Sequence, residues 1–564
     1  MSMFGGQNAE NITEAQLLKA PQACMSCRKQ KRKCSKTLPA CALCHRMGRH
    51  CDYSDSAPAP TSEDFHALRM KLTELESKLK YSQRGFGTSF TNNGLHGGLF
   101  MQGEQIGQLH QVSGFSLPRE LPWLGVQNKF PSLAFLHGLA FRSAGIAAPR
   151  PNFNTPSDII ELLGSGLNIE IIMNNYFLSI HQWIPILSKK RLTRYLNKPQ
   201  WEFTPDFALL YLSIKLLISK PKDGIDCSQN ELYLAAKRFI NLMQSTGFIS
   251  ILVLQANILI TLYEYGHAIY PATWMSSGWS VRYGNLLGIN GDKEAIDLLG
   301  KPGDEIDQEE RLRAWWAVLL IDRIISISSM LYITNSQEPK GEDMLPIDDD
   351  AWERGEILSA PRMTVSTPIA EHLSSFARLC QIHVLIGQIM LHLKDKSVSE
   401  PTRFTKATKL HADALELVRK IKDESLASKN LFSLISPLAL TYSSLCILCS
   451  PYSSISDEAN EGKNQMRKQA IAGLDTVAVN IIDFVDQVNI ATQTLQDLDR
   501  VSPFIMNAIY AGSLTLTRLH RENSEESYQA SLGPLRQCLR KLSTRWRIAA
   551  DYLRILEVHE FAYI

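Results

Sequence analysis

The arrangement of apolar and polar residues over most of this chain has the period of an α-helix. In residues 309–329 the apolar positions recur every three or four residues and form one stripe, which comprises Leu312, Trp315, Trp316, Leu319, Leu320, Ile324 and Ile327. Residues 168–187 and 249–267 are apolar around nearly the whole helix, which is typical of a deep core. Runs with the alternation of β-strands are scarce. The pattern predicts a mostly α protein in which residues 120–564 form one large helical domain or two fused ones.

A shorter amphipathic pattern lies in residues 62–80. Its apolar residues are spaced alternately three and four apart, as in the seam of a coiled coil: Phe65, Leu68, Leu72, Leu75 and Leu79. Lys71 and Glu76 occupy flanking positions at which opposite charges attract across a parallel dimer. We therefore expect a short coiled coil that joins two copies of the chain; an amphipathic helix packed on its own domain is the alternative.

Three other segments have no periodic pattern. Residues 1–20 are predicted to be disordered. Residues 52–61 are rich in Ser, Pro and Ala, and residues 81–119 are rich in glycine, so both are predicted to be flexible linkers.

Composition adds one strong asymmetry. Six of the eleven cysteines lie between Cys24 and Cys51, together with eight Lys or Arg and no Asp or Glu. Because the formal net charge of the whole chain is only +2, the rest of the chain is mildly acidic. A small basic head on an acidic body suggests a nucleic-acid partner at the head.

The chain start lacks the basic and apolar regions of a secretory signal, and we find no run of roughly 18 apolar residues. We therefore expect an intracellular protein without a membrane partner. Thiols stay reduced in that compartment, so clustered cysteines indicate a metal site before they indicate disulfides.

The cysteine spacing is two copies of C-x2-C-x6-C, formed by Cys24, Cys27, Cys34, Cys41, Cys44 and Cys51. Zinc takes four thiolates, so six sulfurs can serve two Zn²⁺ ions only if two sulfurs are shared. The repeat makes Cys24 and Cys41, the first cysteine of each half, the natural bridges. A peptide so short and so poor in apolar residues needs the metal in order to fold. A disulfide scaffold is the alternative.

This block resembles the fungal binuclear zinc cluster, the Zn(2)-C6 fungal-type DNA-binding domain. The basic segment 27–34 (CRKQKRKC), Pro39 and Tyr53 also match that family. The resemblance implies a small zinc-nucleated fold with two short helices in a nuclear transcription factor that regulates RNA polymerase II transcription of a pathway or gene cluster. It also implies that Lys31 contacts bases, usually in CGG half-sites, whereas Gln30 departs from the basic residue that is frequent at its position.

The basic residues of the block suit double-stranded DNA. Five of them are predicted on a short helix whose end enters the major groove, namely Arg28, Lys29, Lys31, Arg32 and Lys33. Lys36, Arg46 and Arg49 are expected at phosphates, where they add affinity without sequence information. A solvated basic surface or a nuclear import signal alone is the alternative. One cluster covers about three base pairs, so a homodimer through residues 65–79 would pair two half-sites.

The helical region resembles the middle homology region of the same regulators. Four of its segments match in the expected order, at 176–187, 254–275, 309–323 and 342–352. The resemblance implies a regulatory role, with intramolecular inhibition, a small-molecule effector and contacts to the transcription machinery or co-regulators all open. Within this region His181 is expected in the core and residues 347–350 (IDDD) in a solvated loop.

The usual catalytic motifs H-E-x-x-H, G-x-S-x-G and the P-loop are absent from the sequence, so we do not expect an enzyme. An enzyme, or a zinc protein-interaction module, that is merely tethered to nucleic acid is the rival hypothesis.

Overall fold

A computed structural model describes residues 19–20, 22–53, 133–137, 154–196, 204–291, 297–328, 333–427, 431–454, 461–523 and 526–561. The chain divides into two compact units, Met1–Ser113 and Gly114–Ile564. The predicted disordered start, the linkers and the coiled coil at 62–80 lie almost entirely outside the described residues, so these remain predictions.

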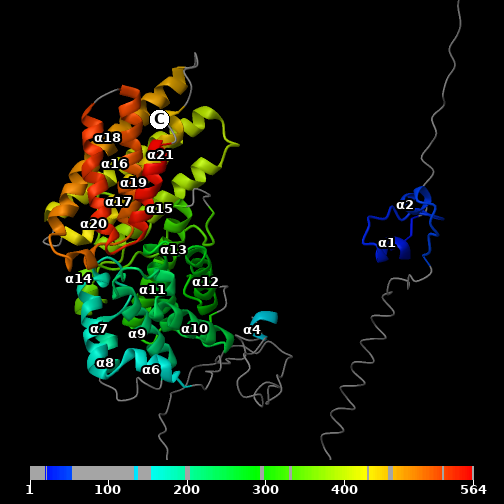
Figure 1. Ribbon diagram of the computed structural model, residues 1–564, viewed down its shortest axis with the longest axis horizontal. Helices are drawn as coiled ribbons and strands as arrows, with labels where there is room; N and C mark the ends of the chain where they lie inside the picture. Colours follow the sequence, from blue (N-terminus) through cyan, green and yellow to red (C-terminus); the bar gives the residue numbers. More distant parts are fainter. Residues whose placement is uncertain are drawn as a thin grey trace, which may run out of the picture. The chain divides into compact units, whose positions relative to one another are not determined.

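The first unit contains two short helices, α1 (Met25–Lys29) and α2 (Ala42–Arg46), drawn in dark blue in Figure 1. Each helix starts directly after the first cysteine of a half-repeat, with Cys24 and Cys41 as N-caps. A backbone hydrogen bond from Met25 N to Asp52 O at 2.9 Å joins the two ends of the block, and one from Ala20 N to Lys36 O at 2.8 Å joins the preceding residues to its middle.

The described residues of the second unit form helices joined by loops, and one isolated bridge, Met344 with Thr364, is found among them. Its first helices are α4 (Leu133–Leu136), α6 (Ser157–Leu163), α7 (Gly166–Leu178), η1 (Ile180–Gln182), α8 (Lys189–Leu196), α9 (Pro205–Ile218), η3 (Cys227–Gln229), α10 (Glu231–Ser245), α11 (Ile251–Gly266), α12 (Ala272–Leu287), α13 (Glu305–Ser328) and α14 (Asp349–Arg354). They are followed by α15 (Ser375–Lys394), α16 (Glu400–Ala427), α17 (Leu431–Ser453), α18 (Glu461–Ala491), η4 (Asp497–Arg500), α19 (Ile505–Asn523), α20 (Glu526–Ser543) and α21 (Ile548–Phe561). The expected mostly α fold is confirmed.

The central helices are buried because their sequences are apolar on nearly all sides. Every residue of α11 is buried, and the helix packs against α9, α12 and α13. Its first turn is capped by Ser250, whose hydroxyl accepts a hydrogen bond from Leu252 N at 3.2 Å. In α13 the apolar stripe predicted from the sequence faces the interior, with Leu320 and Ile324 almost fully buried.

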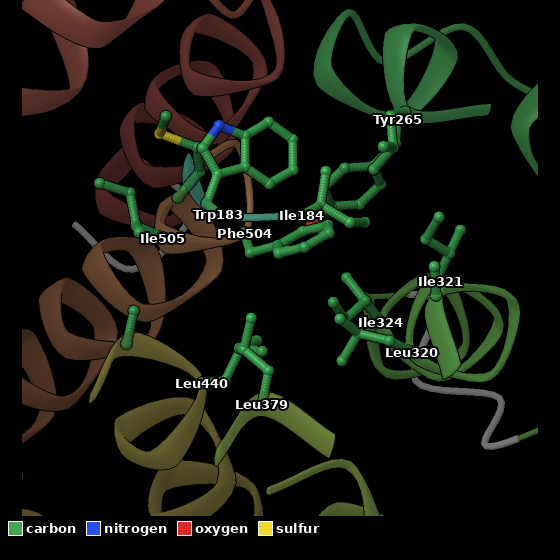
Figure 2. Packing of buried hydrophobic residues seen from close by; sticks show 14 of the residues in the cluster. Trp183, Ile184, Tyr265, Leu320, Ile321, Ile324, Leu379, Leu440, Phe504 and Ile505 are labelled. Carbon is green, nitrogen blue, oxygen red and sulfur yellow. The ribbon is translucent and has the colours of Figure 1, made fainter. Parts of the chain in front are cut away.

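One continuous core joins the earlier and later helices. The earlier helices α6–α12 and the later helices α15–α21 occupy opposite halves of the unit in Figure 1, with α13 between them. Figure 2 shows side chains from α13, α15, α17 and α19 converging with Trp183 on one interior. The rings of Trp183 and Phe504 meet edge to face with centroids 5.5 Å apart. The body is therefore one domain with a shared core.

A buried arginine holds the acidic segment 347–350 against α13. The Arg313 side chain has no exposed surface, and it donates to Glu309 Oε1 at 3.0 Å and to Asp349 Oδ1 at 2.9 Å. It also donates to the carbonyl oxygen of Ile347 at 2.8 Å, and the Asp348 carboxylate caps α14 by accepting from Ala351 N. The expected solvated loop is only partly solvated: Asp350 is exposed and Asp348 is half-buried. Ile347 is buried, and Asp349 neutralises a buried arginine that would otherwise lack a partner.

Two helices, α15 and α17, are long and apolar enough to cross a membrane by length and composition. Within their most apolar stretches, 78% and 83% of the residues are buried inside the unit. Both helices also pack against each other and against α16. Their burial places both helices in the core of the second unit.

Candidate metal centre and nucleic-acid interface

The six clustered cysteines lie around two overlapping centres. Among the described residues, Cys24, Cys27, Cys34 and Cys41 form one group of four sulfurs, and Cys24, Cys41, Cys44 and Cys51 form the other. All sulfurs in a group lie within 4.8 Å of one another. Cys24 and Cys41 belong to both groups, so the structure brings together the two residues that the half-repeats suggested as bridges.

The sulfur spacing fits zinc. Four thiolates at about 2.3 Å from a tetrahedral ion lie about 3.8 Å apart. The observed Sγ–Sγ distances are 3.8 Å for Cys24 and Cys41, 3.6 Å for Cys24 and Cys44, and 3.7 Å for Cys27 and Cys41. All eleven cysteines of the chain lie in described residues as free thiols, so a disulfide scaffold is excluded. The donor set matches two Zn²⁺ ions.

The electrostatic environment of the sulfurs depends on burial and on backbone donors. Burial raises the pKa of the Cys24 and Cys27 thiols, so both favour the protonated form when no cation is bound. At Cys34 burial acts in the same direction, but hydrogen bonds outweigh it and lower the pKa to about 6. A divalent cation reverses the cost of ionisation for all six thiols, so zinc binding should release protons.

The two half-repeats have the same local fold. In the first half, the N–H of Lys31 donates to Arg28 O and that of Arg32 donates to Cys27 O. In the second half Gly48 N and Arg49 N make the matching bonds to His45 O and Cys44 O. This is the Schellman pattern, which ends a helix with one residue in the left-handed region. Lys31 (φ 49°) and Gly48 (φ 57°) are those residues.

This motif corrects the sequence interpretation of the basic segment. Only Arg28 and Lys29 belong to α1, whereas Lys31, Arg32 and Lys33 follow the end of the helix. The left-handed Lys31 costs backbone energy that glycine avoids in the second half. The chain turns at Lys31 because the next ligand, Cys34, must return to the same metal centre as Cys27.

The predicted DNA-contacting side chains all lie on the surface of the first unit. Each is exposed: Arg28, Lys29, Lys31, Arg32, Lys33, Lys36, Arg46 and Arg49. The four cysteines with almost no exposed surface lie beneath them as the small core of the unit. With no acidic residue between Cys24 and Cys51, this surface has a uniformly positive charge, which suits a polyanion.

The structure contains one contact in the cluster unit that the sequence pattern does not indicate. The side-chain oxygen of the uncharged Gln30 accepts a hydrogen bond from the Arg49 guanidinium at 2.5 Å. The contact joins the end of α1 to the loop after α2. No local pattern could reveal it, because the partners are 19 residues apart and meet only when the cluster is folded.

Comparison with known protein families agrees with this geometry. The family described as "Fungal Zn(2)-Cys(6) binuclear cluster domain" matches residues 22–60. The family described as "Fungal specific transcription factor domain" matches residues 173–469, more than half of the chain. The second match reaches well beyond the four segments that suggested it in the sequence.

Curated relatives cover much of the chain. The transcription factor BOA15 of Botryotinia fuckeliana is 37% identical over 164 residues, which are 28% of this chain and 89% of that protein. The pigment biosynthesis transcriptional activator pigB of Monascus ruber is 24% identical over 68% of this chain and 71% of its own length. The tropolone cluster transcription factor tropK of Talaromyces stipitatus is 22% identical over 94% of this chain and 96% of its own length.

Proposed function

The chain belongs to the fungal specific transcription factor family with an N-terminal Zn(2)-Cys(6) cluster, and from this premise we propose that it binds paired CGG-type half-sites as a homodimer and controls the genes of one biosynthetic pathway. The family and the curated relatives are transcription factors and not enzymes. The chain is thus a DNA-binding regulator of transcription whose cluster domain holds two zinc ions.

The observation that carries the proposal is the pair of thiolate sets sharing Cys24 and Cys41 beneath an exposed cationic surface. Bound zinc supplies the rigid cross-links of a unit that has almost no other core. The residues around it present α1 and the turn at Lys31 as one fixed edge. Fixed geometry supports our proposal of base recognition, since hydrogen bonds to base edges tolerate little displacement.

We assign base contact to Lys31 and phosphate contact to the other cations. Lys31 is exposed on the turn that ends α1, and its ammonium group can donate to guanine O6 and N7 in the major groove. In the first half-repeat, Arg28 and Lys29 come shortly before Lys31. In the second, Arg46 and Arg49 flank Gly48, which corresponds to Lys31. They are well suited to neutralise phosphates on either side of the contacted bases.

Dimerisation would supply the specificity that one cluster lacks. About three base pairs recur far too often in a genome to mark a promoter, whereas two half-sites at a set separation do not. The heptad residues 65–79 lie shortly after the cluster, and their pattern supports a parallel pair of helices. Residues 52–61 would then set the separation of the half-sites.

The regulated genes are proposed from the relatives. The names of pigB and tropK assign these proteins to pigment biosynthesis and to a tropolone cluster. Their alignments cover most of this chain, including its helical body, so we infer a similar pathway-specific role in the nucleus. The body would contribute the contacts to co-regulators and to RNA polymerase II machinery.

In vitro selection from random duplexes tests the proposal. The full-length chain loaded with zinc should enrich duplexes with two CGG triplets at one preferred separation, and a chelator should abolish the enrichment. Enrichment of single triplets would contradict the homodimer but not the binding of DNA by the zinc cluster. No enrichment, or enrichment that survives complete zinc removal, would contradict the whole proposal.

A further inference from the structure

Two of the six zinc ligands are less protected than the other four. Cys34 and Cys51 are half-buried, whereas each of the remaining four has at most 2% of its surface exposed. Cys34 and Cys51 each belong to one group of sulfurs only, so each is a terminal ligand of one zinc ion. A thiolate that is held by one ion and reached by solvent is the first to meet a chelator or an oxidant. Loss of zinc should therefore begin at these two sulfurs.

One side chain meets both of these ligands. The Tyr53 hydroxyl lies 3.9 Å from Cys34 Sγ, and the Cys51 sulfur is within hydrogen-bonding range of the same hydroxyl. The Tyr53 side chain packs against the cysteine core of the unit and is itself half-buried. Because Tyr53 and Cys34 are 19 residues apart, the contact exists only when the cluster is folded.

The loop between the half-repeats fixes the position of this hydroxyl. Tyr53 donates a hydrogen bond to the carbonyl oxygen of Thr37 at 3.2 Å. Thr37 is held in turn, since its own hydroxyl donates to Ala40 O at 3.0 Å. A phenol has a single proton to donate, and Thr37 O accepts it at a shorter distance than the Cys34 sulfur. Tyr53 is thus held beside the two sulfurs mainly by its tether to the loop.

We propose that Tyr53 is a positioning residue that retains zinc in the cluster by covering its two accessible ligands. The side chain excludes water and solutes from Cys34 and Cys51, and the hydrogen bond to Thr37 keeps the ring in place. Residues just outside the ligands commonly change metal affinity by about 10–100-fold without touching the metal. This role concerns the lifetime of the metal in the cluster and does not depend on the DNA sequence that the chain binds.

Transfer of zinc from the full-length zinc-loaded chain to the chelator 4-(2-pyridylazo)resorcinol tests the cover. Tyr53→Ala removes the ring and its hydroxyl and should release zinc about tenfold faster or more. Tyr53→Phe keeps the ring and removes the tether, so we expect a smaller acceleration of about threefold to fivefold, as the loss of one hydrogen bond produces. Met47→Ala, the control, removes a side chain of the same unit that is 52% exposed and should leave the rate unchanged.

Alkylation distinguishes a local cover from a general loosening of the unit. The zinc-loaded chains are treated briefly with iodoacetamide, and peptide mass spectrometry gives the modified fraction of each cysteine. In Tyr53→Ala, Cys34 and Cys51 should be modified well before the buried terminal ligands Cys27 and Cys44. In Tyr53→Phe the pattern should stay close to that of the unaltered chain. A merely structural role of Tyr53 would raise the modification of all the ligands together.

The covering role is excluded if Tyr53→Ala releases zinc at the rate of the unaltered chain. It is also excluded if Tyr53→Phe is as fast as Tyr53→Ala, or if the six ligands are alkylated together. Should Tyr53→Ala fail to hold zinc during purification, Tyr53→Leu, which keeps a smaller apolar cover, takes its place in both measurements. Neither measurement involves DNA, so failure of the covering role would leave the proposed function standing.

Discussion

The side-chain oxygen of Gln30 accepts a hydrogen bond from the Arg49 guanidinium at 2.5 Å and so joins the two halves of the zinc cluster unit. Gln30 follows α1, and Arg49 follows the left-handed turn after α2. Both residues are exposed, so the contact does not build a core. It limits the directions in which Arg49 can point, which matters if Arg49 contacts a phosphate.

This relationship predicts different effects for its two partners. Gln30→Ala should weaken binding to all duplexes about fivefold, because a hydrogen bond that positions Arg49 contributes about 1 kcal/mol. The charge is unchanged, so the slope of log affinity against log salt should stay the same. Arg49→Ala should also weaken all sequences alike but reduce that slope by about one unit. Filter binding at several salt concentrations measures both quantities, and a reduced slope for Gln30→Ala would contradict the positioning role.

The proposed contact of Lys31 with bases can be tested by a substitution that adds no backbone strain. Lys31→Gly removes the side chain at a left-handed position that glycine occupies freely, as Gly48 does in the second half. We expect it to reduce discrimination against a mutated triplet by about 1–3 kcal/mol while retaining binding to random DNA. Lys31→Ala should show the same loss with a less stable cluster. Competition with single-base variants is the measurement, and unchanged discrimination in Lys31→Gly would assign base contact to another residue.

The shared ligands should differ from the others in metal content. Cys51 belongs to one group of four sulfurs and Cys41 to both. Cys51→Ser should therefore retain one of the two zinc ions, whereas Cys41→Ser should lose both and abolish DNA binding. Elemental analysis of the purified chains gives the stoichiometry. Equal zinc content in the two variants would contradict bridging by Cys41.

Zinc loss should also follow pH in a defined direction. Because burial raises the pKa of the Cys24 and Cys27 thiols, protons compete with the metal there, and zinc affinity should fall as the pH falls. Metal release during an acid titration, followed with a zinc-sensitive dye, should parallel the loss of DNA binding. DNA binding that persists after the metal has left would contradict the dependence of DNA binding on zinc.

The predicted coiled coil has its own test. Deletion of residues 65–79 should weaken binding to a paired site far more than binding to a single triplet, because only the paired site uses two copies at once. Mobility shift with both probes makes the comparison. An equal loss on the two probes would exclude dimerisation through this segment.

Arg313 should be essential to the helical body. Its buried side chain neutralises Asp349 and shares the buried Glu309 with Arg362. Arg313→Ala therefore leaves the buried carboxylate charge only partly compensated and should lower the free energy of unfolding by about 3 kcal/mol. Urea unfolding measures the change. Arg354→Ala serves as the control, since its pair with Glu356 lies at the surface and should leave the midpoint unchanged. A small effect of Arg313→Ala would mean that the acidic segment is held by other contacts.

Local sequence information was sufficient for the metal centre. The two C-x2-C-x6-C repeats specified which sulfurs come together, because ligand spacing and the coordination number of zinc leave few arrangements for so short a peptide. Helical periodicity likewise identified the apolar stripe of α13 and the fully buried α11, because the spacing of apolar residues along a helix determines which of its faces are buried. The coiled coil rests on the same kind of pattern and awaits its test.

Tertiary structure alone decided what depends on residues distant in the sequence. Trp183 and Phe504 meet in one core, which settles that the body is a single domain. The acidic segment became the partner of Arg313, and His181 contacts Glu353, 172 residues away. Even the end of α1 at Lys29 follows from the return of Cys34 to the metal site. Such pairings arise from packing, which satisfies buried charge with whatever partner the fold brings near, and no local pattern encodes them.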